Sequence, residues 1–560
     1  MQTSLESFYH ALETLEVRGI NVAEKRKEIQ EEVERFKKEV ESVKRHDIED
    51  KKMSDLINEH LTSMKSKIGQ WEQYFQEQAK REKFRESLEN NFIIIIYGKV
   101  KAGKSTLGNF VAQHCLGTQK PEFRKYDKAG EHKTKELEVQ EDGFAVKITE
   151  CTSEIQLFKL GGMVWVDTPG LSSMTKENGE LASQYIGAAD YIIFPTSSDA
   201  PLQNDEITQI QELIRLSKQD HIRLIITKSD RTEEDEINNE IVKILHNKTA
   251  ENRKLQEEDI TNRLQDNLKD KTNQTYPNFT ADKVFSISVI TAKKGLEEND
   301  QELFEGSNIT RFYESMRETL EKAPKLKQQS PYKTLIALID SILQKDSKQD
   351  LKGVRNDLEE VRKLIKLKRK ECENLVANLR TEIGLKINHK IATQTRGINR
   401  HNFESIFIAL QEEIKTETEQ SIQSEFAELI EDFSIRFNVL MPKLDTEVKD
   451  EYVKVERVKE RSLLERTINF LTLDLFCSEE TSTIKKVIGN NIDELKEHNR
   501  KMLQDTYQKK YLEKCKNQIE RQLFAPCDSL AGELNACITR FEAALSRLRD
   551  KISSEDSKIN

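Results

Sequence analysis

Apolar residues recur at intervals of three and four positions over the first 90 and the last 230 residues of the chain. This spacing places them on one face of an α-helix, so it predicts amphipathic helices in both regions. The second region is expected to contain a helix from about 333 to 383, roughly 75 Å long at about 1.5 Å per residue. The two clearest stripes are Ile29, Val33, Phe36, Val40 and Val43, and Leu351, Val354, Leu358, Val361 and Ile365.

The region between them has a different pattern. It holds 13 of the 20 glycines and six of the nine prolines, which turns require and helix interiors exclude. Five short apolar runs alternate with helical stretches, which predicts a mainly parallel sheet with helices on both faces. These runs are Phe92–Tyr97, Met163–Asp167, Tyr191–Phe194, Ile222–Thr227 and Val284–Ser288. The long charged segment 231–280 is interpreted as a helical insertion before the last strand.

The segment FIIIIYGKVKAGKSTLGNF carries the strongest functional signal. In it, a glycine is followed by four residues and then by Gly-Lys-Ser, between an apolar strand and an expected helix. That context is typical of a phosphate-binding loop, whose backbone N–H groups surround phosphate oxygens. Lys104 is expected to reach the β- and γ-phosphates, and Ser105 to ligate Mg²⁺. The predicted nucleotide-binding residues of the loop are Gly98, Ala102, Gly103, Lys104, Ser105 and Thr106.

A second motif, VWVDTPG at 164–170, ends the next apolar run. An acidic residue at the end of such a strand lies near the magnesium ion of nucleotide-hydrolysing enzymes. Asp167 is therefore predicted to act there, usually through a water molecule. The backbone amide of Gly170 is predicted to sense the γ-phosphate.

A third motif, IITKSD at 225–230, ends another run. A carboxylate here can accept hydrogen bonds from N1–H and the exocyclic amine of guanine, whereas adenine offers no such pair of donors. Asp230 is therefore predicted to select guanine, with Lys228 lying along the base and Thr227 opening the loop. This motif argues against an ATPase of the structural-maintenance type. A last guanine-contacting loop is expected at 288–293, without one residue being singled out.

The three motifs, in this order and spacing, resemble those of the dynamin superfamily of large GTPases, and most of all the bacterial dynamin-like proteins. The motifs cover only the α/β part, and the resemblance of the rest is architectural. It implies an α/β P-loop GTPase head joined to an elongated all-α neck and trunk. The expected domains are an N-terminal helical neck segment at 1–90, a GTPase domain at 91–325, and a helical trunk with a returning neck helix at 326–560.

The resemblance also implies a switch threonine between the first two motifs. Thr134 is the prediction, because it precedes a strand-like run, and Thr152 is the alternative. Leu171 stands where small GTPases carry a water-orienting glutamine, which implies that the P-loop and head-to-head dimerisation position the water. The predicted magnesium ligands are thus Ser105, Thr134 and Asp167.

Lys101 lies within the P-loop at a position where the related guanylate-binding proteins carry an arginine that acts as a finger in cis. Lysine has the same charge but lacks the planar fork of arginine. The alternative is a lysine that points to solvent or pairs with an acidic neighbour. The predicted catalytic residues are accordingly Lys104, Ser105, Thr134 and Lys101.

Composition narrows the partners. The chain has 560 residues and a formal net charge of -10, without the basic excess that a nucleic-acid-binding protein carries. Its seven cysteines are scattered and form no C-x-x-C, which favours reduced thiols in a cytoplasmic protein. The start of the chain lacks the features of a signal peptide, and no apolar run approaches the roughly 20 residues of a membrane span. Any membrane association is therefore expected to be peripheral.

Two segments have alternative interpretations. The apolar cluster at 463–476 is either a buried trunk helix, which we favour, or the membrane-touching tip that the family resemblance implies. The stretch 384–403 holds Lys386, Lys390, Arg396 and Arg400 without an acidic residue. It is either a solvated turn between long helices or a contact for anionic lipid head groups.

These observations lead to one main expectation and one alternative. The main expectation is a dynamin-like mechanochemical GTPase that binds GTP or GDP with Mg²⁺, hydrolyses GTP, pairs through its heads, and remodels or associates with membranes. Partner dynamin-like subunits are also expected. The alternative is a nucleotide-gated protein scaffold with weak hydrolysis and no direct membrane activity.

Overall fold

The computed structural model forms two compact units. The first comprises residues 1–41, 65–354 and 537–560, and the second comprises 42–64 and 355–536. The domain bounds expected near 90 and 325 stay a prediction. The residues that the structure describes are 2–43, 50–115, 120–126, 136–137, 143–144, 155–168, 186–215, 221–237, 240–272, 279–280, 282–343, 350–430, 441–458 and 481–559.

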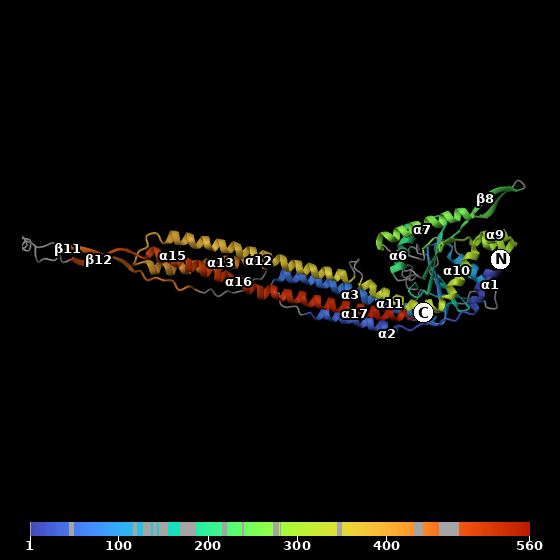
Figure 1. The fold of residues 1–560 in the computed structure, drawn as a ribbon, viewed down its shortest axis with the longest axis horizontal. Helices are drawn as coiled ribbons and strands as arrows, with labels where there is room; N and C mark the ends of the chain where they lie inside the picture. Colours follow the sequence, from blue (N-terminus) through green and yellow to red (C-terminus); the bar gives the residue numbers. More distant parts are fainter. Residues whose placement is uncertain are drawn as a thin grey trace, which may run out of the picture. The chain divides into compact units, whose positions relative to one another are not determined.

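An eight-stranded sheet lies at the centre of the first unit, in the strand order β10-β7-β6-β1-β5-β4-β2-β3 (Figure 1). Five neighbouring strands pair in parallel, and each overlaps one of the five apolar runs predicted from the sequence. They are β1 (Phe92–Ile96), β5 (Met163–Asp167), β6 (Tyr191–Ser197), β7 (Ile222–Thr227) and β10 (Phe285–Ser286). Three further strands continue the sheet in antiparallel pairing at one edge: β4 (Ile155–Leu160), β2 (Glu122–Tyr126) and β3 (Glu136–Leu137).

Side chains of the central strands alternate between two apolar cores, one on each face of the sheet. In β1, Phe92, Ile94 and Ile96 belong to one core, whereas Ile93 and Ile95 belong to the other. The mainly parallel sheet with helices on both faces is thereby confirmed. The first core is covered by α1 (Gln2–Glu13), α4 (Lys104–Gln113), α8 (Val289–Glu298), α9 (Gln301–Gly306) and α10 (Ile309–Glu321), and the second by α6 (Asn204–Arg215) and α7 (Ala250–Thr272).

The helix α1 is part of the first core, although the sequence pattern placed it with the neck helices. Its Phe8 and Tyr9 are buried against Tyr313 of α10, with ring centroids 5.1 and 5.8 Å away. The Tyr9 hydroxyl also donates to the Val111 carbonyl oxygen of α4 at 2.7 Å. The start of the chain therefore stabilises the sheet domain.

The segment predicted to be a helical insertion is only partly helical. A β-hairpin of β8 (Asp230–Ile237) and β9 (Glu240–Asn247) precedes α7, so the prediction is wrong for the first half of 231–280. The apolar residues of β9 pair across the hairpin with β8, a tertiary pairing that helical periodicity did not reveal. Figure 1 shows the hairpin projecting beyond the point where α7 begins.

Four longer helices complete the first unit wholly or in part: α2 (Ala23–Ser42), α3 (Lys51–Glu86), α11 (Ala323–Leu343) and α17 (Ala525–Asp556). The ring of Phe541 in α17 stacks on Phe36 of α2, with centroids 4.3 Å apart, and lies 5.8 Å from the ring of Trp71 in α3. These ring contacts pack α17 against α2 and α3.

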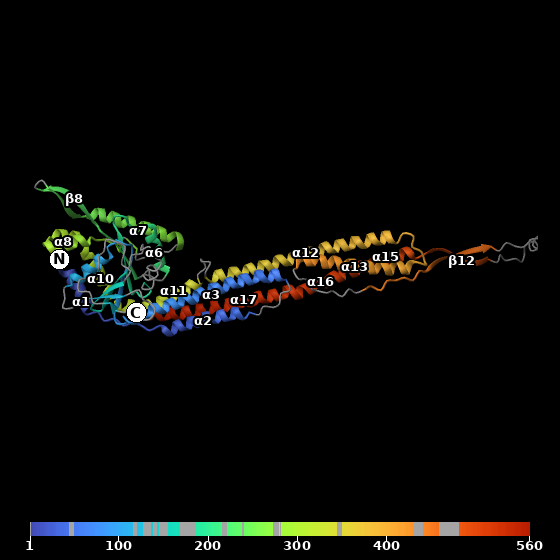
Figure 2. The ribbon, with the colours of Figure 1, turned by 180° about the vertical axis from the view of Figure 1, so that it is seen from behind.

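Helices also dominate the second unit. Its helices α12 (Leu351–Gln394) and α13 (Phe403–Leu429) lie alongside α15 (Ile492–Leu503) and α16 (Leu512–Ile519), which follow each other end to end through the π-helical segment Gln504–Tyr511 (Figure 2). The single helix predicted from 333 to 383 is wrong, because α11 ends at Leu343 and α12 begins at Leu351. The unit further contains an antiparallel ribbon of β11 (Asp450–Val458) and β12 (Thr481–Asn490), which was not predicted. The apolar cluster at 463–476 lies outside the described residues.

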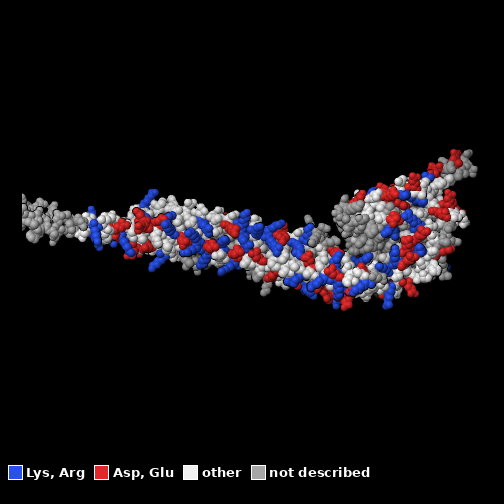
Figure 3. Space-filling view, in the orientation of Figure 1, with Lys and Arg blue, Asp and Glu red and all other residues white. Residues whose placement is uncertain are grey.

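Most cations of the basic stretch 384–403 are neutralised by carboxylates. Lys386 pairs with Glu382 at 2.5 Å, Lys390 pairs with Glu413 at 2.5 Å and with Glu417 at 2.7 Å, and Arg400 pairs with Asp450 at 2.8 Å. Basic and acidic side chains are interspersed over the visible face of these helices (Figure 3). None of the described helices has the length and apolar character that crossing a membrane requires.

A buried charge cluster joins the sheet to two of the long helices. Asp190, directly before β6, accepts from Arg85 of α3 at 2.7 Å and from Lys327 of α11 at 2.9 Å. Its second oxygen also accepts from the Ile93 N–H at 3.0 Å. The side chains of Asp190 and Lys327 are fully buried. Burial lowers the pKa of Lys327, and the negative charge of Asp190 partly offsets that effect.

Asp190→Asn is expected to lower the free energy of unfolding by about 3–5 kcal/mol, because it leaves two cations without their buried counter-charge. Urea unfolding followed by circular dichroism measures the loss. Glu321→Gln is the matched control: its carboxylate pairs with Arg317 at 2.7 Å on the surface, where such a pair contributes less than about 1 kcal/mol. Equal decreases in the free energy of unfolding for the two variants would show that the buried cluster stabilises the protein no more than a surface ion pair does.

Candidate functional site

The three predicted motifs meet at the carboxyl edge of the parallel strands. The P-loop follows β1, Asp167 ends β5, Thr227 ends β7, and Ser288 comes shortly after β10. Ligands of open α/β sheets bind in the crevice outside the carboxyl ends of the strands. The fold therefore brings residues that are far apart in the sequence to one candidate site.

The P-loop has the backbone conformation of an anion-binding turn. Gly103, the residue before α4, has a φ of 83°, and Lys101 has a φ of 65°. Residues with a Cβ rarely adopt such angles, so the loop around Lys101 is held by its surroundings. Gly98 is needed for a different reason, since a Cβ there would lie 2.8 Å from the Pro195 carbonyl oxygen. The amide groups of the first turn of α4 are thus free to face an anion.

Lys104 is buried at the start of α4 and its side chain folds over the loop. Its Nζ donates to the carbonyl oxygens of Gly98 at 2.9 Å and Lys99 at 2.7 Å. Burial lowers the pKa of Lys104, and the charge of Asp167 raises it in part. The ammonium is therefore held against the backbone of the P-loop.

Ser105 and Asp167 form the second part of the site. The Ser105 hydroxyl donates to Asp167 Oδ2 at 2.5 Å, while the other carboxylate oxygen is buried without a hydrogen-bond partner among the described residues. Burial raises the pKa of Asp167 to about 6, against the opposing effects of Lys104 and Ser105. A buried carboxylate oxygen with no donor fits a cation. The described residues contain no group of three or more His, Cys, Asp and Glu that would hold a metal alone.

The loop Thr227–Asp230 is connected to the P-loop. The Thr227 hydroxyl donates to the Ala102 carbonyl oxygen at 2.8 Å, which joins the third predicted motif directly to the first. Lys228 has a φ of 56°. Asp230 accepts from the Ser288 hydroxyl at 2.7 Å, and Ser288 also caps α8 by accepting from the Thr291 N–H. The expected loop at 288–293 therefore lies beside Asp230.

The remaining predicted residues differ in what the structure says of them. Thr106 lies in the first turn of α4 with its side chain half-buried, and Lys101 is exposed. Thr134, the alternative Thr152, Gly170 and the neighbouring Leu171 lie outside the described residues. Of the predicted magnesium ligands, the structure therefore describes Ser105 and Asp167. Of the predicted catalytic residues, it describes Lys101, Lys104 and Ser105.

Two residues that touch the Thr227–Asp230 loop were missed by the sequence analysis. The Ser198 hydroxyl donates to the Lys228 carbonyl oxygen at 2.7 Å, and Lys248 Nζ donates to the Ser198 hydroxyl at 2.9 Å. Ser198 follows a predicted strand. Residues just beyond the carboxyl end of a parallel strand are candidates for a ligand site, so the sequence could have indicated Ser198. Lys248 follows the unexpected hairpin, and nothing in the local sequence marks it.

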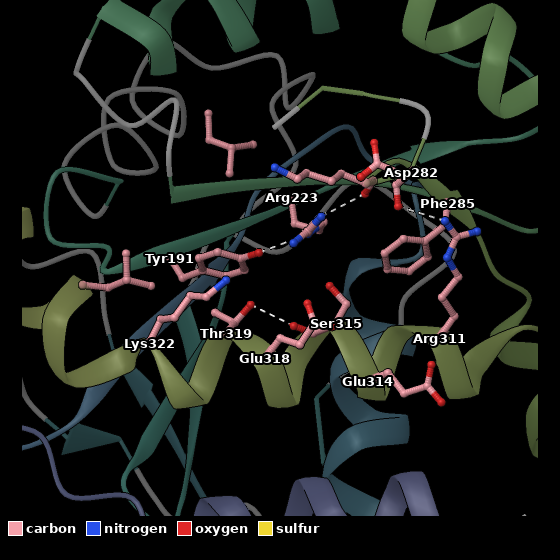
Figure 4. Close-up of a pocket in the computed structure, with 13 residues that line it drawn as sticks. Tyr191, Arg223, Asp282, Phe285, Arg311, Glu314, Ser315, Glu318, Thr319 and Lys322 are labelled. Atoms are coloured by element: carbon pink, nitrogen blue, oxygen red, sulfur yellow. Dashed lines mark hydrogen bonds between the residues drawn. The ribbon is translucent and has the colours of Figure 1, made fainter. Parts of the chain in front are cut away.

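A separate cavity of about 390 Å³ lies at the opposite, amino-terminal edge of the strands (Figure 4). Its walls come from the starts of β6, β7 and β10 and from α10. Arg223 lies within it and donates to the Tyr191 hydroxyl at 3.2 Å and to the Lys283 carbonyl oxygen at 3.1 Å. None of the residues predicted to bind nucleotide lines this cavity, so it is distinct from the candidate site.

Residues 89–345 match the family model of the elongation factor Tu GTP binding domain. The matched range contains the P-loop, Asp167 and the Thr227–Asp230 loop. The match confirms the prediction of a GTPase-type domain in this part of the chain.

Two curated relatives are uncharacterized proteins. One, from Acinetobacter baylyi, is 26% identical over 289 residues, which are 51% of this chain and 54% of that protein. The other, from the xynA 3′ region of a Caldicellulosiruptor species, is 25% identical over 314 residues, which are 50% of this chain and 70% of that protein. The match thus spans about half the length of the Acinetobacter protein.

Among solved structures, the chain is similar to the LeoA bacterial dynamin GTPase from ETEC, with 13% identity, 95% of this chain and 96% of that chain covered, and a TM-score of 0.28. It is also similar to a structure described as an oligomerised bacterial dynamin pair that provides a mechanism for the long-range sensing and tethering of membranes. That similarity has 13% identity, covers 94% of this chain and 80% of that chain, and has a TM-score of 0.28. Both are described as bacterial dynamins.

Gly98→Ala is expected to abolish GDP binding and to lower the free energy of unfolding by about 1–3 kcal/mol, because the new methyl group would collide with the Pro195 carbonyl oxygen. Gly69→Ala is the control. A methyl group at Gly69, within α3, meets nothing within 4 Å and is expected to stabilise the helix by about 0.5–1 kcal/mol. Calorimetric titration and urea unfolding measure the two effects. Normal GDP binding by Gly98→Ala would contradict the tight packing of the loop.

Proposed function

We propose that this chain is a dynamin-like GTPase that binds GTP with Mg²⁺ and hydrolyses it to GDP and phosphate. The observation that carries the proposal is the meeting of Lys104, the Ser105–Asp167 pair and the Asp230–Ser288 pair at one edge of the sheet. The match of residues 89–345 to a GTP-binding domain supports it.

The phosphate groups would lie in the P-loop. Backbone N–H groups from Gly98 to Thr106 would surround them, and Lys104 would exchange its two carbonyl acceptors for phosphate oxygens. Ser105, Asp167 and Thr134 are the proposed magnesium ligands, Asp167 through a water molecule. Mg²⁺ held there supplies neutralisation of charge on the phosphate oxygens. The amide of Gly170 would contact the γ-phosphate.

Guanine would be read by the loop after β7. Asp230 has one oxygen on the Ser288 hydroxyl, which fixes the plane of the carboxylate. That carboxylate would accept from N1–H and the exocyclic amine of the base. Lys228 would lie along the base, and Thr227 holds the loop against the P-loop through Ala102. The hydrogen bond between Thr227 and Ala102 would keep the base site next to the phosphate site, so that one nucleotide can occupy both.

Hydrolysis would combine charge neutralisation with pairing of two heads. The exposed side chain of Lys101 is available to act as a finger in cis, once a partner head orders it over the phosphates. Such fingers accelerate hydrolysis by about 10³–10⁵ where they operate fully. A lysine acts as a point charge and is expected to contribute less.

Membrane association and dynamin-like partner subunits complete the proposal. The ribbon β11–β12 supports a contact with an apolar environment, because Tyr452, Val487 and Ile488 are 54%, 53% and 60% exposed. A scaffold without direct membrane activity is the second candidate. The observation in its favour is the pairing of Lys386, Lys390 and Arg400 with carboxylates, which leaves less charge for lipid head groups.

Lys104→Ala is expected to reduce GTP turnover by about 10²–10³-fold, because it removes the buried cation that faces the developing phosphate charge. Phosphate release is measured across protein concentrations, with and without liposomes. Lys322→Ala, an exposed lysine at the opposite edge of the sheet, is the control for general effects of removing a lysine. Undiminished turnover in Lys104→Ala would refute the proposed GTPase site. Lipid-stimulated turnover with deformation of the liposomes would favour the mechanochemical role over the scaffold.

Asp230→Asn is expected to weaken GDP binding by about 10²-fold or more, because the new amide NH2 would face the exocyclic amine of guanine and the remaining bond from N1–H would go to an uncharged acceptor. Xanthosine diphosphate should gain affinity, since its ring carries a carbonyl where guanine carries the amine. Competition titrations measure both changes. Wild-type protein that binds ADP as tightly as GDP would show that the loop does not select guanine.

A further inference from the structure

The loop Thr227–Asp230, called the guanine loop from here on, also leads directly into the hairpin β8–β9. Strand β7 delivers Thr227 to the loop, and β8 begins at its last residue, Asp230. The returning strand β9 ends at Asn247, directly opposite Asp230, and so brings Lys248 beside the loop. Both ends of the hairpin therefore meet the segment that would read the base.

Lys248 reaches the loop through its backbone and through its side chain. Its N–H donates to the Ser229 carbonyl oxygen at 3.0 Å. Its Nζ donates to the Ser198 hydroxyl at 2.9 Å, which donates in turn to the Lys228 carbonyl oxygen at 2.7 Å. A hydroxyl that accepts from an ammonium becomes a better donor, so the two bonds strengthen each other.

Ser198 is held firmly in place between Lys248 and the Lys228 carbonyl group. It is only 5% exposed, and its own N–H donates to the Thr227 carbonyl oxygen at 2.9 Å. Its carbonyl oxygen accepts from Gln256 of α7 at 2.9 Å. Lys248 makes no ion pair within 4.0 Å among the described residues, so its charge is directed at the hydroxyl rather than at a surface carboxylate.

The carbonyl group that accepts from the Ser198 hydroxyl belongs to Lys228, whose backbone is strained. Lys228 has a φ of 56°, a conformation that residues with a Cβ adopt rarely and keep only where their surroundings hold them. The peptide group that follows Lys228 sets the direction of the loop towards Asp230. Fixing its carbonyl therefore fixes the geometry in which the base would be read.

We propose that Ser198 and Lys248 are positioning residues for guanine recognition, which act through the Lys228 carbonyl group. The inference rests on the proposed function, because it requires Asp230 to bind guanine. Their effect falls on the base and not on the phosphates, which the P-loop holds by separate contacts.

Ligands that use different parts of the site test the proposal. Calorimetry measures the binding of GDP, of IDP, which lacks the exocyclic amine, and of inorganic pyrophosphate, each with Mg²⁺. Lys248→Ala is expected to weaken GDP binding roughly tenfold and to narrow the preference for GDP over IDP. Pyrophosphate affinity should stay unchanged. Ser198→Ala should give the same pattern, and Lys248→Arg, which keeps a cationic donor, should restore most of the GDP affinity.

Lys243→Ala is the matched control. This exposed lysine lies on the same hairpin, 3.6 Å from Glu234 and away from the guanine loop, and its loss should change none of the three affinities. Parallel losses of GDP and pyrophosphate affinity in Lys248→Ala would overturn the positioning role, as would unchanged GDP binding. Wild-type protein without GDP binding would instead refute the proposed function, so the two failures are distinct.

Discussion

Parallel pairing of five buried strands is the constraint on which the first unit depends. Such strands carry apolar side chains on both faces, so helices must cover both faces, as α4 and α10 do on one and α6 and α7 on the other. The same pairing aligns the carboxyl ends of the strands along one edge. Hydrogen bonds then connect the segment that follows β1 with the ends of β5 and β7, since Ser105 donates to Asp167 and the Thr227–Ala102 contact joins two segments 125 residues apart.

The parts of the fold that follow from local sequence were predictable. Continuous apolar runs such as Phe92–Tyr97 can be buried only as central strands or core helices, and the flanking turn residues favour strands. The hairpin β8–β9 was not predictable in this way, because β8 reads DRTEEDEI, which has no alternating apolar residues, and its pairing with β9 is visible only in the tertiary structure. The ribbon β11–β12 was missed for a related reason, since several of its apolar residues remain exposed.

The candidate site was predictable to a similar extent. Lys104, Asp167 and Asp230 carry their chemistry in short motifs, so the sequence was enough to single them out. Their partners come from distant segments, and only the tertiary structure shows that Ser288 lies against Asp230 or that Ser198 lies against Lys228. The motif residues define what the site does, whereas these partners define how rigidly it is held.

The buried cluster of Asp190, Arg85 and Lys327 has a consequence for how the sequence can change over time. One carboxylate faces two cations inside the protein, so replacing Asp190 leaves both cations without their counter-charge, whereas replacing one cation leaves Asp190 paired with the other. A substitution of Asp190 should therefore be inherited together with substitutions of Arg85 and Lys327, although the residues come from the start of β6, α3 and α11. Homologous chains that lose Asp190 are expected to have replaced both cations with uncharged side chains as well.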